Sequence, residues 1–151
     1  MRVFLDANVL FSAAKSAGAV RAFLDDLAAG DHALVADRYV ATEARRNVAA
    51  KADDASVEYL DGLLERIEVN AIQFSNLAAL DVAWLPEKDR PVLRAAIALK
   101  CDALVTGDRT HFGPGYGKTF GGVIVYSPAQ LALTIRTLTD AKAGAGAVRR
   151  D

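Results

Sequence analysis

The chain has 151 residues, the size of one domain with a core of ordinary size. Hydrophobic residues make up 52% and charged residues 25%, values that fit a soluble globular protein and exclude a disordered one. The net charge of −1 argues against a constitutive nucleic-acid binder, but it leaves room for an enzyme with a local basic rim.

The sequence also bears on the compartment in which the protein works. No apolar run reaches the roughly 18 residues that span a bilayer, so we expect no membrane partner. Asp6 interrupts the first apolar stretch, where a signal peptide would be uniformly apolar, which argues against export. The single cysteine, Cys101, excludes an internal disulfide and is most simply a small core residue. A cytoplasmic location is therefore expected.

Strands and helices are expected to alternate along the chain. Short buried runs bounded by turn residues predict strands at 2–5, 32–36, 67–71, 103–105 and 123–125. Apolar residues at helical spacing predict helices at 7–14, 20–29, 37–51, 53–66, 89–99 and 127–138, with a helical turn at 75–80. The pattern predicts one α/β/α domain over residues 1–140, in which helices cover both faces of a central parallel sheet of about five strands. The glycine-rich stretch 111–122 is expected to be a loop, and residues 141–151 a disordered tail.

Two of the expected strands run into an aspartate. Asp6 follows strand 2–5, and Asp108 follows strand 103–105 after Thr106 and Gly107. If these strands are parallel neighbours, both carboxylates lie at the carboxyl edge of the sheet, where open α/β sheets bind ligands. Two unpaired carboxylates 4 Å apart repel by about 4 kcal/mol at an effective dielectric near 20. The pair therefore favours a divalent metal at this edge.

Two further acids can reach the same edge. Glu43 lies in the first two turns of the helix that follows strand 32–36, and Asp89 opens the helix before strand 103–105. Each of the four acids has a structural alternative. Asp6 and Asp89 can cap helices, Glu43 can pair with a residue one turn on, and Asp108 can close a turn. Together they present the oxygen ligands that Mg²⁺ prefers, and such ions orient phosphodiesters and stabilise the leaving oxygen.

Neighbouring polar residues leave similar alternatives open. Asn8 can bind a ligand or close an Asx turn, and Thr106 can orient a carboxylate or fill the strand end. Basic residues near the expected edge form a rim or are ordinary solvated charges: Arg45, Arg46, Lys51, Lys88, Arg90, Arg94, Arg109 and Lys118. The sequence has no histidine and cysteine cluster with zinc spacing, no Walker-type phosphate loop and no nucleophile motif beside either histidine.

From Arg2 to about Leu138 the chain resembles the PIN-domain nucleases. The matching pieces are Val3–Leu10, the helical Glu43, Asp89–Leu93 with Ala95 and Ala96 after it, Leu104–Asp108, and Val125–Pro128. The resemblance implies a parallel sheet flanked by helices and a ribonuclease that depends on Mg²⁺ or Mn²⁺. It also implies a catalytic and metal-binding quartet with two supporting residues: Asp6, Glu43, Asp89 and Asp108, supported by Asn8 and Thr106.

The resemblance carries expectations about partners as well. Small bacterial and archaeal members of the family are often toxins of the VapC type, held inactive by an antitoxin and usually dimeric. It therefore implies an RNA substrate, an antitoxin protein and a homodimer, although the length also suits a stand-alone PIN protein.

The sequence hypothesis is a metal-dependent ribonuclease. Asp6, Asp89 and Asp108 would hold one or two Mg²⁺ or Mn²⁺ ions, and Glu43 would complete the shell directly or through water. The residues Arg90, Arg109 and Lys118 are candidates to contact RNA phosphates.

Two other functions remain open. A haloacid-dehalogenase-type phosphohydrolase also has an aspartate after its first strand, but it needs a second acid two residues on, where this chain has Asn8. In a non-catalytic binding module, the four acids would be caps and surface charges.

Overall fold

The computed structural model describes residues 1–71 and 79–148. Within these ranges the chain forms a six-stranded sheet in the order β3-β2-β1-β4-β6-β5. The strands are β1 (Arg2–Leu5), β2 (Ala33–Asp37), β3 (Glu68–Asn70), β4 (Ala103–Val105), β5 (Thr119–Phe120) and β6 (Val123–Tyr126). All paired neighbours are parallel except β5 and β6, so the predicted α/β class with a mostly parallel sheet is confirmed.

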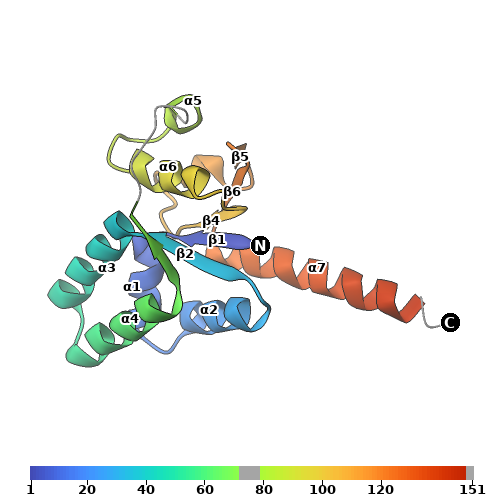
Figure 1. Ribbon diagram of the computed structural model, residues 1–151, viewed down its shortest axis with the longest axis horizontal. Helices are drawn as coiled ribbons and strands as arrows, with labels where there is room; N and C mark the ends of the chain where they lie inside the picture. Colours follow the sequence, from blue (N-terminus) through green and yellow to red (C-terminus); the bar gives the residue numbers. More distant parts are fainter. Residues whose placement is uncertain (72–78, 149–151) are drawn as a thin grey trace.

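Helices lie on both faces of this sheet. They are α1 (Ala7–Lys15), α2 (Ala19–Ala29), α3 (Arg38–Lys51), α4 (Asp54–Arg66), α5 (Ala79–Val82), α6 (Arg90–Ala98) and α7 (Pro128–Val148). In Figure 1, α1 to α4 lie below the sheet, and α5 and α6 lie above it. None of the helices in the described ranges combines the length and the apolar character needed to cross a lipid bilayer.

The two central strands bring their carboxyl ends together. Apart from Arg2 at the start of β1, strands β1 and β4 are buried on both faces, and these residues are apolar without a polar alternation. Leu5 is paired with Val105, and the backbone N–H of Asp6 donates to the Val105 carbonyl at 3.1 Å. The condition stated from the sequence, that these strands are parallel neighbours, is met, and Asp6 and Thr106 leave the sheet side by side.

Aspartate caps fix where α3 and α4 begin. A carboxylate oxygen of Asp37 accepts from the backbone N–H of Val40 at 2.9 Å, and Asp53 does the same for Ser56. Both helices thus begin within one residue of the predicted starts at 37 and 53. The start of α3 at the carboxyl end of β2 places Glu43 in the second turn, close to the edge that carries Asp6.

The sheet has one strand more than expected. Residues 119–120, in the stretch predicted to be a loop, form β5 and pair antiparallel with β6. Gly121 and Gly122 have positive φ angles of 56° and 85°, which let the chain reverse between the two strands. A two-residue strand is too short to give an alternating pattern, so the sequence carried no periodic signal for it.

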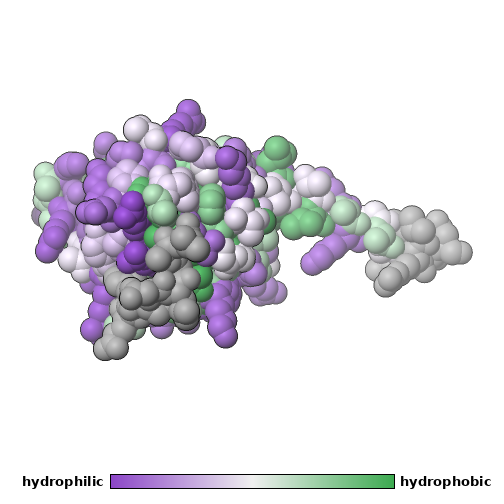
Figure 2. Space-filling model, turned by 90° about the horizontal axis from the view of Figure 1, so that it is seen from above, coloured by the Kyte–Doolittle hydropathy of each residue, from purple (hydrophilic) through white to green (hydrophobic). Residues whose placement is uncertain are grey.

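The last helix is longer than expected. It was predicted to end near Leu138 and continues to Val148, so residues 141–148, assigned to a disordered tail, are helical. Alternate alanines in this segment have the highest helix propensity of any residue and offset the two glycines. The helix projects from the body, and apolar side chains near its root face solvent, with Leu133 64% and Leu138 51% exposed (Figures 1 and 2). The predicted turn at 75–80 lies mostly outside the described residues, and α5 begins at Ala79.

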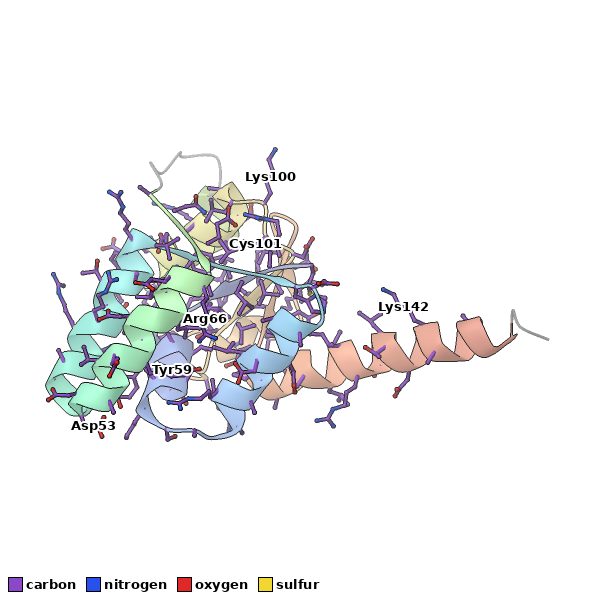
Figure 3. All side chains as sticks on the ribbon, turned by 60° about the horizontal axis from the view of Figure 1, so that its bottom comes forward. Asp53, Tyr59, Arg66, Lys100, Cys101 and Lys142 are labelled. Carbon is purple, nitrogen blue, oxygen red and sulfur yellow. The ribbon has the colours of Figure 1, made fainter. Side chains whose placement is uncertain are left out.

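The entry into β4 buries the single cysteine. Lys100 adopts a φ angle of 55°, which turns the chain from α6 toward the strand and directs its own side chain away from the body (Figure 3). Cys101 is buried, and this burial raises the pKa of its thiol to about 11. The predicted role of Cys101 as a core residue is confirmed.

Two glycine substitutions are expected to change stability in opposite directions. A methyl group at Gly115 would overlap the indole of Trp84, which is already stacked on Phe120 with ring centroids 4.7 Å apart. Gly62, inside α4, has open space around its added carbon. We expect Gly115→Ala to lower the free energy of unfolding by about 1–3 kcal/mol and Gly62→Ala to raise it by about 1 kcal/mol. Urea denaturation measures both, and equal effects would contradict the packing around Trp84.

Candidate active site

The four predicted acids line one hollow of about 200 Å³ at the carboxyl edge of the sheet. Asp6 comes from the end of β1, Glu43 from α3, Asp89 from the start of α6 and Asp108 from the loop after β4. The hollow is also lined by Ala7, Asn8, Tyr39, Asn47, Lys88 and Val92. The structure therefore brings together all four side chains that the sequence placed at this edge.

Asp6 is the most buried of the four acids, with 6% of its surface exposed. One carboxylate oxygen accepts from the backbone N–H of Ala7 at 2.7 Å and caps α1. The other accepts from the Thr106 hydroxyl at 2.8 Å and from Asn8 Nδ2 at 3.3 Å. Burial, reinforced by the charges of Glu43 and Asp89, raises the pKa of Asp6 to about 6 despite these hydrogen bonds. Asp6 therefore both caps α1 and lines the acid hollow.

Asn8 and Thr106 connect the two strand-ending aspartates. Asn8 Oδ1 accepts from the Gly107 backbone N–H at 2.8 Å, and its Nδ2 donates to Thr106 Oγ1 at 3.3 Å. Thr106 Oγ1, which donates to Asp6, also accepts from the backbone N–H of Asp108 at 3.2 Å. This network fixes the Asp6 carboxylate relative to the loop that carries Asp108, which is the geometry expected of supporting residues.

Asp89, Asp108 and His111 form a tight cluster within the hollow and its rim. Asp89 stands at the cap position of α6 but makes no side-chain cap hydrogen bond. Its Oδ2 and the Oδ2 of Asp108 each lie 3.0 Å from His111 Nδ1. Burial raises the pKa of Asp89, and the nearby Asp108 adds to this effect while His111 opposes it. Asp108 also accepts from the His111 backbone N–H, as a turn residue would.

His111 was not among the residues predicted for the site. His111 has no second histidine nearby in the sequence, so it does not match the spacing of a histidine or cysteine metal-binding motif. The signal that could have found it is its position three residues after Asp108, which allows the two side chains to meet across one turn.

Glu43 lies on the rim of the hollow and is exposed. Its expected alternative was a pair with Arg46 or Asn47. In residues 1–71 and 79–148, no cation lies within 4.0 Å of its carboxylate. Within the described part of the chain Glu43 thus forms no ion pair, and the cation that shares the hollow with it is Lys88.

The predicted basic residues differ in their placement. Arg90 donates from Nε to the Leu85 carbonyl at 2.8 Å and from a terminal nitrogen to the Ala83 carbonyl, so its guanidinium holds the loop before α6. Arg109 and Lys118 are exposed, and Lys88 lines the acid hollow. Contact with RNA stays a prediction for Arg90, Arg109 and Lys118. Arg90 is the least favourable candidate of the three, because its guanidinium already donates two hydrogen bonds to the loop.

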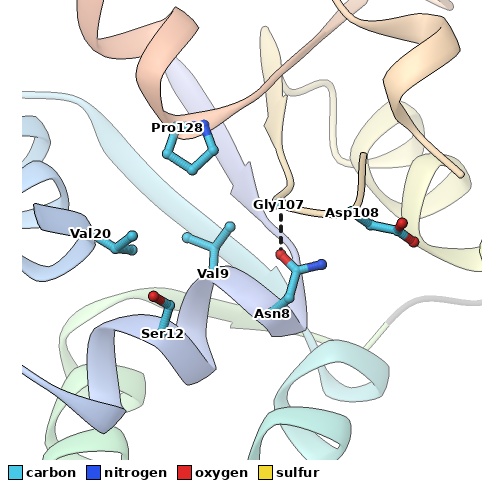
Figure 4. Close-up of a pocket in the computed structure, with 7 residues that line it drawn as sticks. All are labelled: Asn8, Val9, Ser12, Val20, Gly107, Asp108 and Pro128. Carbon is cyan, nitrogen blue, oxygen red and sulfur yellow. Dashed lines mark hydrogen bonds between the residues drawn. The ribbon is translucent and has the colours of Figure 1, made fainter. Parts of the chain in front are cut away.

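A second, larger hollow of about 460 Å³ adjoins the acids (Figure 4). It shares Asn8 and Asp108 with the acid hollow. The rest of its lining is Val9, Ser12, Val20, Gly107 and Pro128. Figure 4 shows the Asp108 carboxylate directed away from this hollow, so the space beside the acids is mainly apolar.

A model of the PIN domain family matches residues 2–110. The chain belongs to the PIN domain family. The resemblance found in the sequence motifs is thereby confirmed, because the match includes all four acids and covers more than half of the chain. A search of curated proteins found no match.

Solved PIN structures share the fold at low sequence identity. VapBC2 from Rickettsia felis, bound to a promoter DNA fragment, has a TM-score of 0.61 and 20% identity over 84% of this chain and 98% of that chain. VapC20 from Mycobacterium tuberculosis, described as a sarcin-ricin loop cleaving toxin, has a TM-score of 0.55 and 9% identity over 78% and 98%. FitAcB from Neisseria gonorrhoeae has a TM-score of 0.52 and 21% identity over 83% and 97%. At these identities the likeness shows the fold alone.

Proposed function

We propose that this PIN domain is a divalent-metal-dependent ribonuclease whose catalytic and metal-binding residues are Asp6, Glu43, Asp89 and Asp108. The observation that carries the proposal is the convergence of four carboxylates on one hollow. A buried oxygen, Asp89 Oδ2, has no hydrogen-bond partner among the described residues, which fits a position meant for a cation. The four proposed metal ligands are carboxylates, and their oxygens are the kind of ligand atom that Mg²⁺ and Mn²⁺ prefer.

The chemistry follows from the charges in the hollow. Asp6, Asp89 and Asp108 would hold one or two ions, with Glu43 completing the shell from the rim. When bound, such an ion acidifies water and offsets the negative charge on the scissile phosphate. Without a cation the four carboxylates repel a phosphodiester, so they disfavour RNA at the very edge where it must react. Thr106 and Asn8 keep the carboxylates in place.

The surroundings of the acids give room for a strand of RNA. The apolar hollow beside Asp108 can take the sugar or base next to the scissile phosphate, and the exposed Arg109 and Lys118 can contact flanking phosphates. The small net charge of the chain means that these contacts are local rather than the result of an overall field.

The proposal extends to a toxin that is paired with an antitoxin. The fold is shared with VapC20, which is described as a toxin, and with VapBC2, which is described as bound to a DNA fragment from its own promoter. A homodimer and a cytoplasmic location belong to the same proposal, the latter because a lone buried cysteine fits a reducing compartment.

Removal of divalent metal tests the proposed activity. We expect the purified chain to cleave a mixed-sequence RNA in Mn²⁺ or Mg²⁺, to lose cleavage in excess chelator and to recover it when Mn²⁺ is restored in excess. Product formation on a denaturing gel measures the rate. Cleavage that persists in excess chelator would contradict the metal mechanism, and the absence of cleavage with either metal would favour a binding module.

A further inference from the structure

His111 occupies a position that the acid quartet does not explain. Its Nδ1 lies 3.0 Å from Asp89 Oδ2 and 3.0 Å from Asp108 Oδ2. The three side chains are 30%, 17% and 25% exposed, so all are partly withdrawn from water. One ring nitrogen is thus directed at two carboxylates that come from different elements.

Hydrogen bonding satisfies only one of these two contacts. A histidine Nδ1 carries at most one hydrogen. Its hydrogen bond goes to Asp108 Oδ2, whereas Asp89 Oδ2, although equally close and buried, has no hydrogen-bond partner among the described residues. A buried carboxylate oxygen without a partner is unfavourable and calls for a cation at this point.

The separations fit ligands that share one ion. Adjacent ligands in an octahedral shell with metal–ligand distances of about 2.1 Å stand about 3.0 Å apart. The three ligand atoms all lie within 4.8 Å of one another. A nitrogen donor also changes which ion is preferred, because imidazole suits first-row transition metals better than Mg²⁺.

We propose that His111 is a metal ligand, through Nδ1, of a divalent transition metal that Asp89 and Asp108 also bind. The inference rests on the proposed metal-dependent function and deepens it, since it assigns a nitrogen donor to the site and favours Mn²⁺ over Mg²⁺. His111 thereby becomes part of the site's metal selectivity, with no requirement that it take part in the chemical step.

Electron spin echo spectroscopy of bound Mn²⁺ tests the nitrogen ligand without any measurement of activity. The chain contains two histidines, and His32 provides a matched control, because its Nδ1 faces the N-terminal amine at 3.0 Å. We expect Mn²⁺ on the full chain to show directly coordinated ¹⁴N, which changes to ¹⁵N after histidine labelling. His32→Asn should keep the signal and His111→Asn should lose it.

Calorimetry provides the second readout. We expect His111→Asn to weaken Mn²⁺ binding by at least about tenfold and Mg²⁺ binding by less. If Mn²⁺ binds stoichiometrically but shows no histidine nitrogen, or the signal survives in His111→Asn, the ligand role is wrong while the proposed function stands. If the wild-type chain binds Mg²⁺ but no Mn²⁺, the ligand role is wrong, and if it binds neither ion, both proposals fail. Should His111→Asn not fold by circular dichroism, the labelled His32→Asn protein decides the question, because His111 is its only histidine.

Discussion

Asp108→Asn is expected to reduce the rate of RNA cleavage by about 100-fold or more in saturating Mg²⁺. The substitution removes one charged metal ligand but keeps an oxygen that can accept from the His111 backbone N–H, so the turn after β4 is preserved. A catalytic metal ion stabilises charge in the transition state by several kcal/mol, and each 1.4 kcal/mol or so corresponds to a factor of ten. Single-turnover cleavage of a defined RNA measures the effect.

A matched control separates this effect from a general loss of acidic charge. Glu58→Gln removes one carboxylate from the exposed face of α4, away from the hollow, and should leave the cleavage rate within about twofold of wild type. Equal rates for Asp108→Asn and the wild-type chain would show that Asp108 is a turn residue and no part of the reacting site.

Asp6→Asn is expected to stabilise the metal-free protein at neutral and higher pH. Burial raises the pKa of Asp6 from its ordinary value of 3.8 to about 6, so the fold favours the protonated carboxyl. That contribution is fully present below about pH 3.8 and is lost as the pH rises through about 6. The shift of about two units corresponds to roughly 3 kcal/mol. The NH₂ group of an amide at position 6 would face Asn8 Nδ2 and could not accept its hydrogen bond, which subtracts from this value. We therefore expect the free energy of unfolding to rise by an amount on the order of 1–3 kcal/mol.

Urea denaturation in chelator between pH 4 and pH 8 measures this gain. The advantage of Asp6→Asn should be largest above pH 7 and shrink as the pH falls toward 4. Added Mn²⁺ should reverse the order, because it stabilises the wild-type chain by binding the native state. A variant that is less stable than wild type at pH 8 without metal, or a difference that is independent of pH, would contradict the buried, ionised carboxylate.

The convergence of the acids followed from the sequence because it depends on topology. Asp6 and Asp108 end strands that are buried on both faces, and parallel neighbours must present their carboxyl ends at one edge. The starts of α3 and α4 also followed from the sequence, because the caps at Asp37 and Asp53 are local hydrogen bonds to the first turn of each helix. What the residue pattern could not supply alone is that Glu43 and Asp89 point into the hollow, and the family resemblance supplied that expectation.

Apart from the extension of α7, which is a matter of local helix propensity, the features that were missed depend on tertiary contacts. Strand β5 exists because two residues pair with β6 across a glycine turn, and such a pairing leaves no periodic trace. The extension of α7 to Val148 reflects alanine propensity outweighing Gly144 and Gly146. His111 joins Asp89 through a contact between residues more than twenty positions apart, and Arg90 is engaged by backbone carbonyls that no sequence motif indicates.

The most direct measurement of the central claim is metal rescue of a phosphorothioate RNA. A sulfur atom replaces one non-bridging oxygen at the mapped cleavage site, and the two stereoisomers are assayed separately. A hard ion such as Mg²⁺ contacts sulfur poorly, whereas softer Mn²⁺ accepts it. If the acid-bound ion contacts the scissile phosphate, sulfur in at least one stereoisomer slows cleavage in Mg²⁺ by tenfold or more, as a rough expectation, and Mn²⁺ restores it. An equal loss in Mg²⁺ and Mn²⁺ for both stereoisomers would contradict a metal held by these carboxylates against the phosphate.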